Sequence, residues 1–256
     1  MLAAERRTKL AELVRSSGVA STEELAVALQ VSAETIRRDL LALEGQGVIS
    51  RVHGGATIRG QSVVASESSF DVRSEEEAQR KQRIAALAAA LVPSGSLVMI
   101  DVGTTALLVA RALPQALSAT IVTTSLRVAV ELSDRPGLDI MVAGGLLRTG
   151  DLALSGMATS RMLADLHFDV ALLGSGGLHA SAGLTDYHFD EAQTRREIIG
   201  RTAASYVLCD ATKFDRVARY HVADVGEFTG VVVDDDPGAA LTAALRGAGT
   251  EIFSAA

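Results

Sequence analysis

Two adjacent arginines near the start of an amphipathic helix are the first candidates for chemistry in this sequence. They lie in the stretch VSAETIRRDL, residues 31–40. With Ile36 at the centre of the buried face, a step of about 100° per residue directs Arg38 away from the protein and places Thr35 and Arg37 on its flanks. Arginine pairs with guanine edges and with phosphates, so the pattern predicts a helix that contacts DNA.

The elements around this stretch predict a winged helix-turn-helix. Apolar spacing indicates helices over residues 3–16, 22–29 and 33–45, and Ser32 is placed to cap the third. The segment VISRVHGGATI that follows predicts two short strands around a glycine turn. A pair of arginines alone more often lies on a solvated helix face, neutralised by nearby carboxylates. The tight turn before this helix and the wing after it favour DNA recognition instead.

Two groups of side chains are candidates for DNA contact. The helix and its cap contribute Ser32, Glu34, Thr35, Arg37 and Arg38, and the wing and the first helix contribute Arg51, His53, Arg6 and Arg7 as phosphate contacts. Residues 1–58 carry seven basic and seven acidic side chains, so this segment is neutral. DNA-binding domains are usually basic. A winged domain that contacts another protein therefore stays open as an alternative.

The composition is that of an ordinary globular chain. Its 256 residues are 48% hydrophobic and 21% charged, with a net charge of −7, and the length allows two domains. The one cysteine, Cys209, excludes an internal disulfide and lies in an apolar run, which predicts a buried structural thiol. Without a signal peptide or an apolar run of about 18 residues, we expect a cytoplasmic protein that does not enter a membrane. The five histidines show no metal-ligand spacing, so we expect no metal and no cofactor.

Beyond a polar linker the pattern changes to alternating strands and helices. We assign residues 1–58 to the winged domain, 59–74 to the linker and 75–256 to a larger domain. Its first helix is expected over 75–91, opened by a capping pair of Ser74 and Glu77. Apolar strands separated by helices predict an α/β fold with a mostly parallel sheet covered on both faces. The apolar face of the first helix either joins subunits or packs on its own sheet.

Glycines and hydroxyl side chains follow the expected strands at several strand-to-helix turns. Gly103, Thr104 and Thr105 open a helix, whose free N–H groups favour an anion. The further turns contribute Thr124, Ser125, Gly144, Gly145, Gly174 and Gly177, and Lys213 follows another strand end. Ligands of open parallel sheets bind outside the carboxyl ends of the strands. These turns together predict one anion-binding site, although any single turn of this kind is also common in proteins that bind nothing there.

Two sets of motifs resemble the DeoR family of transcription regulators. The first comprises Arg6, Leu10, Val14, Ser32, Thr35, Ile36, Arg37, Arg38, Asp39, Leu40, Arg51 and the run HGGA, and the second comprises the runs DVGTT, LLGSGGL, GLTD, EAQTRREII and DATKF. The resemblance covers about residues 3–254. It implies a bacterial regulator, usually a repressor, whose C-terminal domain is similar in fold to ribose-5-phosphate isomerase and senses a phosphorylated sugar or related metabolite. By this resemblance Asp101, Gly103, Thr104, Thr105 and Lys213 contact the ligand, and Asp186 and Glu191 face the sugar or the wall of its site.

The functional prediction is a repressor of a carbohydrate operon, relieved by a phosphorylated effector. It binds double-stranded operator DNA as a homo-oligomer, a dimer or a tetramer, because one winged domain contacts too little DNA for selectivity. The alternative is a sugar-phosphate isomerase with an appended helical domain, for which Asp101, Asp186, Asp190 and Glu191 are candidate bases. Gly176 stands where the related isomerases place an acid, and we therefore do not expect an enzyme.

Overall fold

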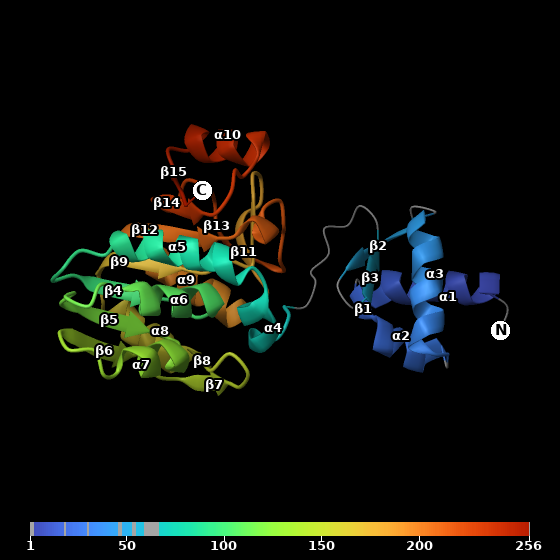
Figure 1. Cartoon of the computed structure of the whole chain (residues 1–256), viewed down its shortest axis with the longest axis horizontal. Coiled ribbons are helices and arrows are strands. Elements are labelled where there is room, and N and C mark those ends of the chain that lie inside the picture. Colours follow the sequence, from blue (N-terminus) through green and yellow to red (C-terminus); the bar gives the residue numbers. More distant parts are fainter. Residues whose placement is uncertain are drawn as a thin grey trace. The chain divides into compact units, whose positions relative to one another are not determined.

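The structure is a computed structural model that describes residues 3–17, 19–29, 31–45, 48–52, 55–58 and 67–255 (Figure 1). Its contacts divide the chain into two compact units, residues 1–66 and residues 67–256. Side chains of the first unit are described only in part.

The first unit combines three helices with a small antiparallel sheet. Its elements are α1 (Ala3–Ser17), β1 (Val19–Ser21), α2 (Thr22–Leu29), α3 (Ala33–Gly45), β2 (Ile49–Val52) and β3 (Gly55–Ile58), with the strands in the order β1-β3-β2. Leu10, Leu25 and Ile36, one from each helix, are buried against one another. This burial fixes which face of α3 points outward. Sequence patterning did not predict β1, since three residues are too few to show a period.

The second unit is built on a seven-stranded parallel sheet. Its strand order is β15-β14-β12-β9-β4-β5-β6. The bounds are β4 Leu97–Ile100, β5 Ala119–Thr123, β6 Leu138–Val142, β9 Phe168–Leu173, β12 Thr202–Cys209, β14 Gly230–Val233 and β15 Glu251–Ser254. The chain moves from β4 through β5 to β6, then returns to the other side of β4 and continues outward from β9. The order of the strands therefore reverses between β4 and β9, where open α/β sheets bind ligands.

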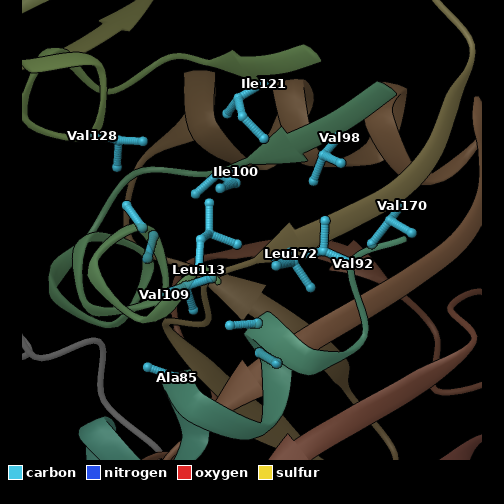
Figure 2. Packing of buried hydrophobic residues seen from close by; sticks show 14 of the residues in the cluster. Ala85, Val92, Val98, Ile100, Val109, Leu113, Ile121, Val128, Val170 and Leu172 are labelled. Atoms are coloured by element: carbon cyan, nitrogen blue, oxygen red, sulfur yellow. The ribbon is translucent and has the colours of Figure 1, made fainter. Parts of the chain in front are cut away.

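Both faces of this sheet are covered. On one face lie α5 (Ala78–Ala90), α6 (Thr104–Ala112) and α7 (Leu126–Leu132); on the other lie α8 (Met157–Ala164), α9 (Phe189–Ile199), α10 (Ala239–Gly247) and a small sheet of β10 (Gly177–His179), β11 (Gly183–Asp186) and β13 (Tyr220–Ala223). Successive side chains alternate between the faces, so Val98 and Ile100 pack towards the α5 side (Figure 2) while Met99 packs towards the α8 side. The predicted α/β fold with a mostly parallel, doubly covered sheet is confirmed.

The start of the second unit differs from the expectation. A short helix, α4 (Phe70–Glu75), covers the end of the segment 59–74 that we expected to be a linker and runs one residue beyond it, and α5 begins only at Ala78. Ser74 caps nothing, because it lies inside α4 and its hydroxyl donates to the carbonyls of Phe70 and Asp71. The expected Ser74–Glu77 capping pair is thus wrong. Of the two roles considered for the apolar face of α5, the structure shows packing on the unit's own sheet.

A β-hairpin that the sequence did not predict follows β6. It consists of β7 (Leu146–Arg148) and β8 (Ala153–Ser155), and its second strand pairs back to the turn after β5 through a bridge between Ala153 and Ser125. Gly145 makes the hairpin possible: its φ is +155°, and a Cβ there would lie 2.3 Å from the carbonyl oxygen of Ser155. The hairpin carries Arg148 towards the carboxyl edge of the sheet.

Candidate functional sites

The outward face of α3 presents the two adjacent arginines to solvent. The side chain of Arg38 is 78% exposed and that of Arg37 is 55% exposed. Each comes no closer than 3.5 Å to a carboxylate oxygen of Glu34, which is itself 61% exposed. Exposed pairs of this kind are worth about 0–1 kcal/mol. Both guanidinium groups can therefore leave Glu34 for a stronger acceptor such as a phosphate or a guanine edge.

Ser32 fixes the start of this helix. Its hydroxyl oxygen accepts a hydrogen bond from the backbone N–H of Thr35 at 3.2 Å, and the two hydroxyls lie 2.9 Å apart. An N-cap of this kind stabilises a helix by about 0.5–2 kcal/mol. The cap therefore holds in place the first turn, which presents Glu34 and Thr35.

Arg6 and Arg7 are engaged inside the first unit. Their Nε atoms donate to the carboxylate of Asp39 at 2.6 and 2.9 Å, and Asp39 is 2% exposed. Burial opposes ionisation of Asp39, but the hydrogen bonds and charges of Arg6 and Arg7 outweigh it and lower the pKa of this carboxyl. These contacts tie α1 to α3. Phosphate contact by Arg6 and Arg7 stays a prediction, while the side chain of Arg51 and the whole of His53 lie outside what the structure describes.

Four side chains meet at the carboxyl edge of the large sheet, where the strand order reverses. Arg195 of α9 donates from Nε to Asp101 at 2.5 Å, forms an ion pair with Asp186 and lies 3.2 Å from Glu191. The Oδ2 atom of Asp101 also accepts from the backbone N–H of Gly174 at 2.8 Å. We call Asp101, Asp186, Glu191 and Arg195 the edge cluster. It joins the ends of β4, β9 and β11 to the first turns of α9.

The edge cluster is buried and has more negative than positive groups. Asp101, Asp186 and Arg195 are each less than 5% exposed. Burial alone would lower the pKa of Arg195, but the three carboxylates raise it well above its ordinary value. Burial raises the pKa of Glu191, helped by Asp186 and Asp101 and opposed by the nearby arginines. Sequence reasoning assigned the three acids but missed Arg195, although its spacing of four residues from Glu191 on a predicted helix was a usable signal.

The turn after β4 opens α6 without a side-chain cap. Its N-cap is Gly103, with φ +122°, and a Cβ at this position would meet no atom within 4 Å. Thr104 is buried, whereas Thr105 is partly exposed beside it. The first N–H groups of a helix favour an anion when no side chain caps them. This turn keeps the features that made it a candidate phosphate site.

The turns after β5 and β6 are occupied by the hairpin. Ser125 is 1% exposed and its hydroxyl caps α7 by accepting from Val128, while the carbonyl of Thr124 accepts from Leu154 at 2.8 Å. The carbonyl of Gly144 accepts from the Thr159 hydroxyl. These groups, together with Gly145, already have structural roles. Their contact with a ligand stays a prediction.

Lys213 lies on the short 3-10 turn Ala211–Lys213 after β12, beside two residues that sequence reasoning did not assign. Its Nζ lies 6.0 Å from the ring centroid of Tyr187, whose hydroxyl lies 3.5 Å from Arg216. Burial and the charge of Arg216 lower the pKa of Lys213. No ion pair of Lys213 or Arg216 is found among the described residues. We call Lys213, Arg216 and Tyr187 the cationic group.

Three glycines after β9 let the backbone pass close to residues of the edge cluster and of the cationic group. A Cβ on Gly176 would lie 2.9 Å from both the Cα of Asp186 and the carbonyl oxygen of Thr185, and one on Gly177 would lie 2.3 Å from the carbonyl of Arg216. Gly174 has more room, with its nearest neighbours at 3.3 Å. The missing acid at Gly176 thus has a local reason, since no side chain fits there in this arrangement.

Family comparisons assign both units. A family model described as "DeoR-like helix-turn-helix domain" matches residues 6–62, and one described as "DeoR C terminal sensor domain" matches residues 76–235. The chain belongs to the DeoR family. The resemblance noted in the motifs is therefore confirmed, and with it the assignment of the chain as a DNA-binding transcription regulator.

Curated relatives of this DeoR-family chain are regulators. The HTH-type transcriptional repressor CsqR of Escherichia coli is 33% identical over 97% of this chain and 94% of the relative. The glycerol-3-phosphate regulon repressor of the same organism is 35% identical over 91% of each chain, and the regulator GolR of Listeria innocua is 30% identical over 97% of each. These names support a regulator over the isomerase alternative.

Solved structures resemble the chain only distantly. A ribose 5-phosphate isomerase of Methanocaldococcus jannaschii shares 17% identity over 52% of each chain with a TM-score of 0.39. The Pyrococcus horikoshii translation initiation factor eIF-2B shares 12% over 88% of this chain and 81% of the other, with a TM-score of 0.46. No function follows from likenesses at this level.

Two kinds of feature are absent from the described residues. Within them, no group of three or more histidine, cysteine or acidic side chains is arranged to hold a metal ion. Nor does any described helix combine the length and apolar character needed to cross a bilayer.

Proposed function

We propose that the protein is a repressor that reads operator DNA with α3 and leaves it when a phosphorylated polyol binds at the edge of the sensor sheet. The exposure of Arg37 and Arg38 carries the DNA half of this proposal. In the same helix the buried Asp39 is already neutralised by Arg6 and Arg7, so the two outward arginines are left with weak internal partners. Such guanidinium groups gain most by pairing with base edges or phosphates.

The distribution of charge supports the class of effector. The carboxylates of the edge cluster can accept hydrogen bonds from the hydroxyl groups of a ligand. Because these carboxylates outnumber the nearby cations, the edge cluster disfavours contact with an anionic group of the ligand. Tyr187 follows Asp186 directly in the chain, and its side chain lies near Lys213 and Arg216. A cationic group whose members form no ion pair among the described residues suits a phosphate. A molecule with hydroxyls at one end and one phosphate at the other matches both.

Assembly into a dimer or a tetramer is part of the proposal. One winged domain contacts too few base pairs for a selective operator, so paired heads are required. The second unit exposes large apolar side chains on α7, β7 and α8, namely Val130 at 74%, Leu146 at 76% and Met157 at 71%. Their exposure supports association between copies.

DNA retention tests the first half. Fragments from the region upstream of the chain's own gene, together with neighbouring promoters, are titrated by fluorescence anisotropy with Arg37→Gln, Arg38→Gln and the parent protein. Each lost bidentate contact costs about 1–3 kcal/mol, or roughly 5- to 150-fold in affinity. Arg111→Gln, which removes a half-exposed arginine of the second unit, is the matched control and should bind as the parent does. Unchanged affinity in both α3 variants would refute the DNA-reading role.

A panel of ligands tests the second half. Glycerol 3-phosphate, ribose 5-phosphate and hexose phosphates are compared with their unphosphorylated forms and with inorganic phosphate. We expect one phosphorylated compound to release the DNA, and Lys213→Met to weaken that release while leaving retention without ligand unchanged. If no compound alters retention, the effector half fails although the DNA half can stand.

A further inference from the structure

An unbroken series of ion pairs leads from the edge cluster to the first residue of the second unit. Glu191 pairs with Arg148 of the hairpin, and Arg148 Nη2 lies 2.7 Å from Asp151 Oδ2. The same Oδ2 atom lies 3.2 Å from Arg73 Nη2 of α4, and Arg73 pairs in turn with Glu67. We call these five residues the ion-pair relay. Glu67 is where the chain arriving from the DNA-binding unit enters the sensor unit.

The relay is shielded from solvent along its length. Its side chains are between 10% and 30% exposed, with Arg148 the most open. Charges shielded in this way are screened little by salt, so a change at one pair is felt by the next. The contacts therefore connect the two ends energetically as well as geometrically.

Arg73 depends on the relay for its position. Its Nε is buried without a hydrogen-bond partner among the described residues, so its guanidinium group is held through the terminal nitrogens by Glu67 and Asp151. The backbone at this same end of α4 is held separately, because Lys81 Nζ donates to the carbonyls of Arg73 and Glu76 at 2.6 and 2.7 Å. Loss of Asp151 would thus loosen the side-chain anchor of α4 without removing its backbone cap.

Arg148 and Arg73 compete for the same oxygen atom of Asp151. Arg148 divides its charge between Glu191 and Asp151, and Asp151 divides one oxygen between Arg148 and Arg73. A group that draws Glu191 away leaves Arg148 with Asp151 as its only described partner. Arg148 then holds this oxygen more strongly, and Arg73 loses its share.

We propose that Arg148 and Asp151 are positioning residues which report the engagement of Glu191 by a polyol hydroxyl to α4, loosening the entry of the chain into the sensor unit. This inference rests on the effector half of the proposed function, since it names how that site is regulated. A conformational signal needs different affinities of the ligand for two arrangements, and the competition at Asp151 supplies the two arrangements.

Hydrogen exchange on the full-length protein, without DNA or ligand, tests the relay directly. Glu191→Gln weakens the pull on Arg148 and mimics an engaged carboxylate, so the amides of Arg73 in α4 and of its C-cap residue Glu76 should exchange about fivefold faster. Asp151→Asn should have a similar effect. The double variant should exchange no faster than Asp151→Asn alone, because residues in one network are not additive. Glu131→Gln, which breaks the Glu131–Arg111 pair outside the relay, is the control.

The amides of β9 serve as the baseline, because they exchange only when the whole unit opens. If Glu191→Gln destabilises the unit and speeds these amides too, Arg148→Gln replaces it, since that variant keeps Glu191 beside Arg195. Arg148→Gln leaves Asp151 to Arg73 alone, so the α4 amides should then exchange more slowly than in the control. Exchange in α4 equal to that of the Glu131→Gln control, or additive effects in the double variant, would overturn the relay. A relay that responds while no sugar phosphate alters DNA retention would instead overturn the effector proposal alone.

Discussion

Replacing Arg195 by glutamine should destabilise the sensor unit more than any other single charge removal considered for this chain. Arg195 is 3% exposed and faces Asp101, Asp186 and Glu191 at once. Without the guanidinium group, three carboxylates lie together in a buried site with Arg148 as the remaining cation. Removing one partner of a buried ion pair typically costs about 3–5 kcal/mol, because the other charge is left uncompensated.

The expected shift in melting temperature follows from this cost. For a unit of roughly 190 residues, each kcal/mol lowers Tm by about 2–4 °C, so Arg195→Gln should lower it by roughly 6–20 °C. The matched control is Arg111→Gln, whose side chain is 54% exposed against Glu131 and whose loss should shift Tm by no more than about 4 °C. Differential scanning calorimetry of the full chain separates the sensor transition from that of the smaller unit.

The penalty should also depend on pH in a defined direction. The pKa of Glu191 is already raised above the ordinary 4.5, and loss of Arg195 raises it further. A carboxyl with a raised folded pKa stabilises the fold below its unfolded pKa, and this contribution is lost as pH rises through the folded value. The difference between variant and parent should therefore grow from about pH 4.5 upward. If Arg195→Gln lowers Tm by the same amount at about pH 4.5 as at higher pH, or leaves Tm unchanged, the account of the edge cluster is refuted.

Three further outcomes follow from the described contacts. Asp39→Asn should lower the free energy of unfolding of the first unit, measured in urea at neutral pH, by about 1–3 kcal/mol. Because the folded pKa of Asp39 is lowered, its stabilisation is present above the ordinary 3.8 and is lost as pH falls through the folded value. A difference between variant and parent that stays constant as the pH is lowered through this region would contradict the prediction. Cys209 is buried and burial raises the pKa of its thiol to about 12, so iodoacetamide at pH 8 should label it only after unfolding, and labelling of the folded chain would count against its burial. Gly176→Ala should cost about 1–3 kcal/mol, because its Cβ meets backbone atoms at 2.9 Å. Gly247→Ala, whose Cβ meets nothing within 4 Å, should be near neutral, and equal chemical denaturation midpoints for the two glycine variants would rule this explanation out.

Much of the architecture could be predicted because it depends on local pattern. The apolar runs that became β4, β5, β9 and β12 are too continuous for strands with one wet face, and the helical stretches between them require parallel crossovers. In α3, the spacing of Ile36, Leu40 and Leu43 fixed the buried face, so the outward direction of Arg38 followed from the helical period alone.

The hairpin of β7 and β8 could not be predicted in the same way. Leu146 and Leu147 are adjacent and both exposed, so the segment shows no alternation of apolar and polar side chains. Its strands are stabilised by pairing with each other and with the turn at Ser125, far away in sequence. The contact of Gly145 with Ser155 is also non-local. From the sequence alone, a glycine pair after a strand indicated a ligand-binding turn as readily as a hairpin.

The identity of an arginine partner decides what each arginine in this chain can do. Arg6, Arg7 and Arg195 face carboxylates that are less than 12% exposed, so moving any of them to another anion would strand a buried negative charge. Among the described residues, Arg37 and Arg38 form ion pairs only with Glu34, which is solvated whether or not they stay, so both can be transferred to DNA at little cost. The sequence alone does not distinguish these arginines. They differ in whether the carboxylate partner is buried, and that partner lies up to ninety-four positions away in the sequence. The proposed function therefore rests on two opposite arrangements: arginines with solvated partners are left for DNA, and an arginine with buried partners shapes the candidate effector site.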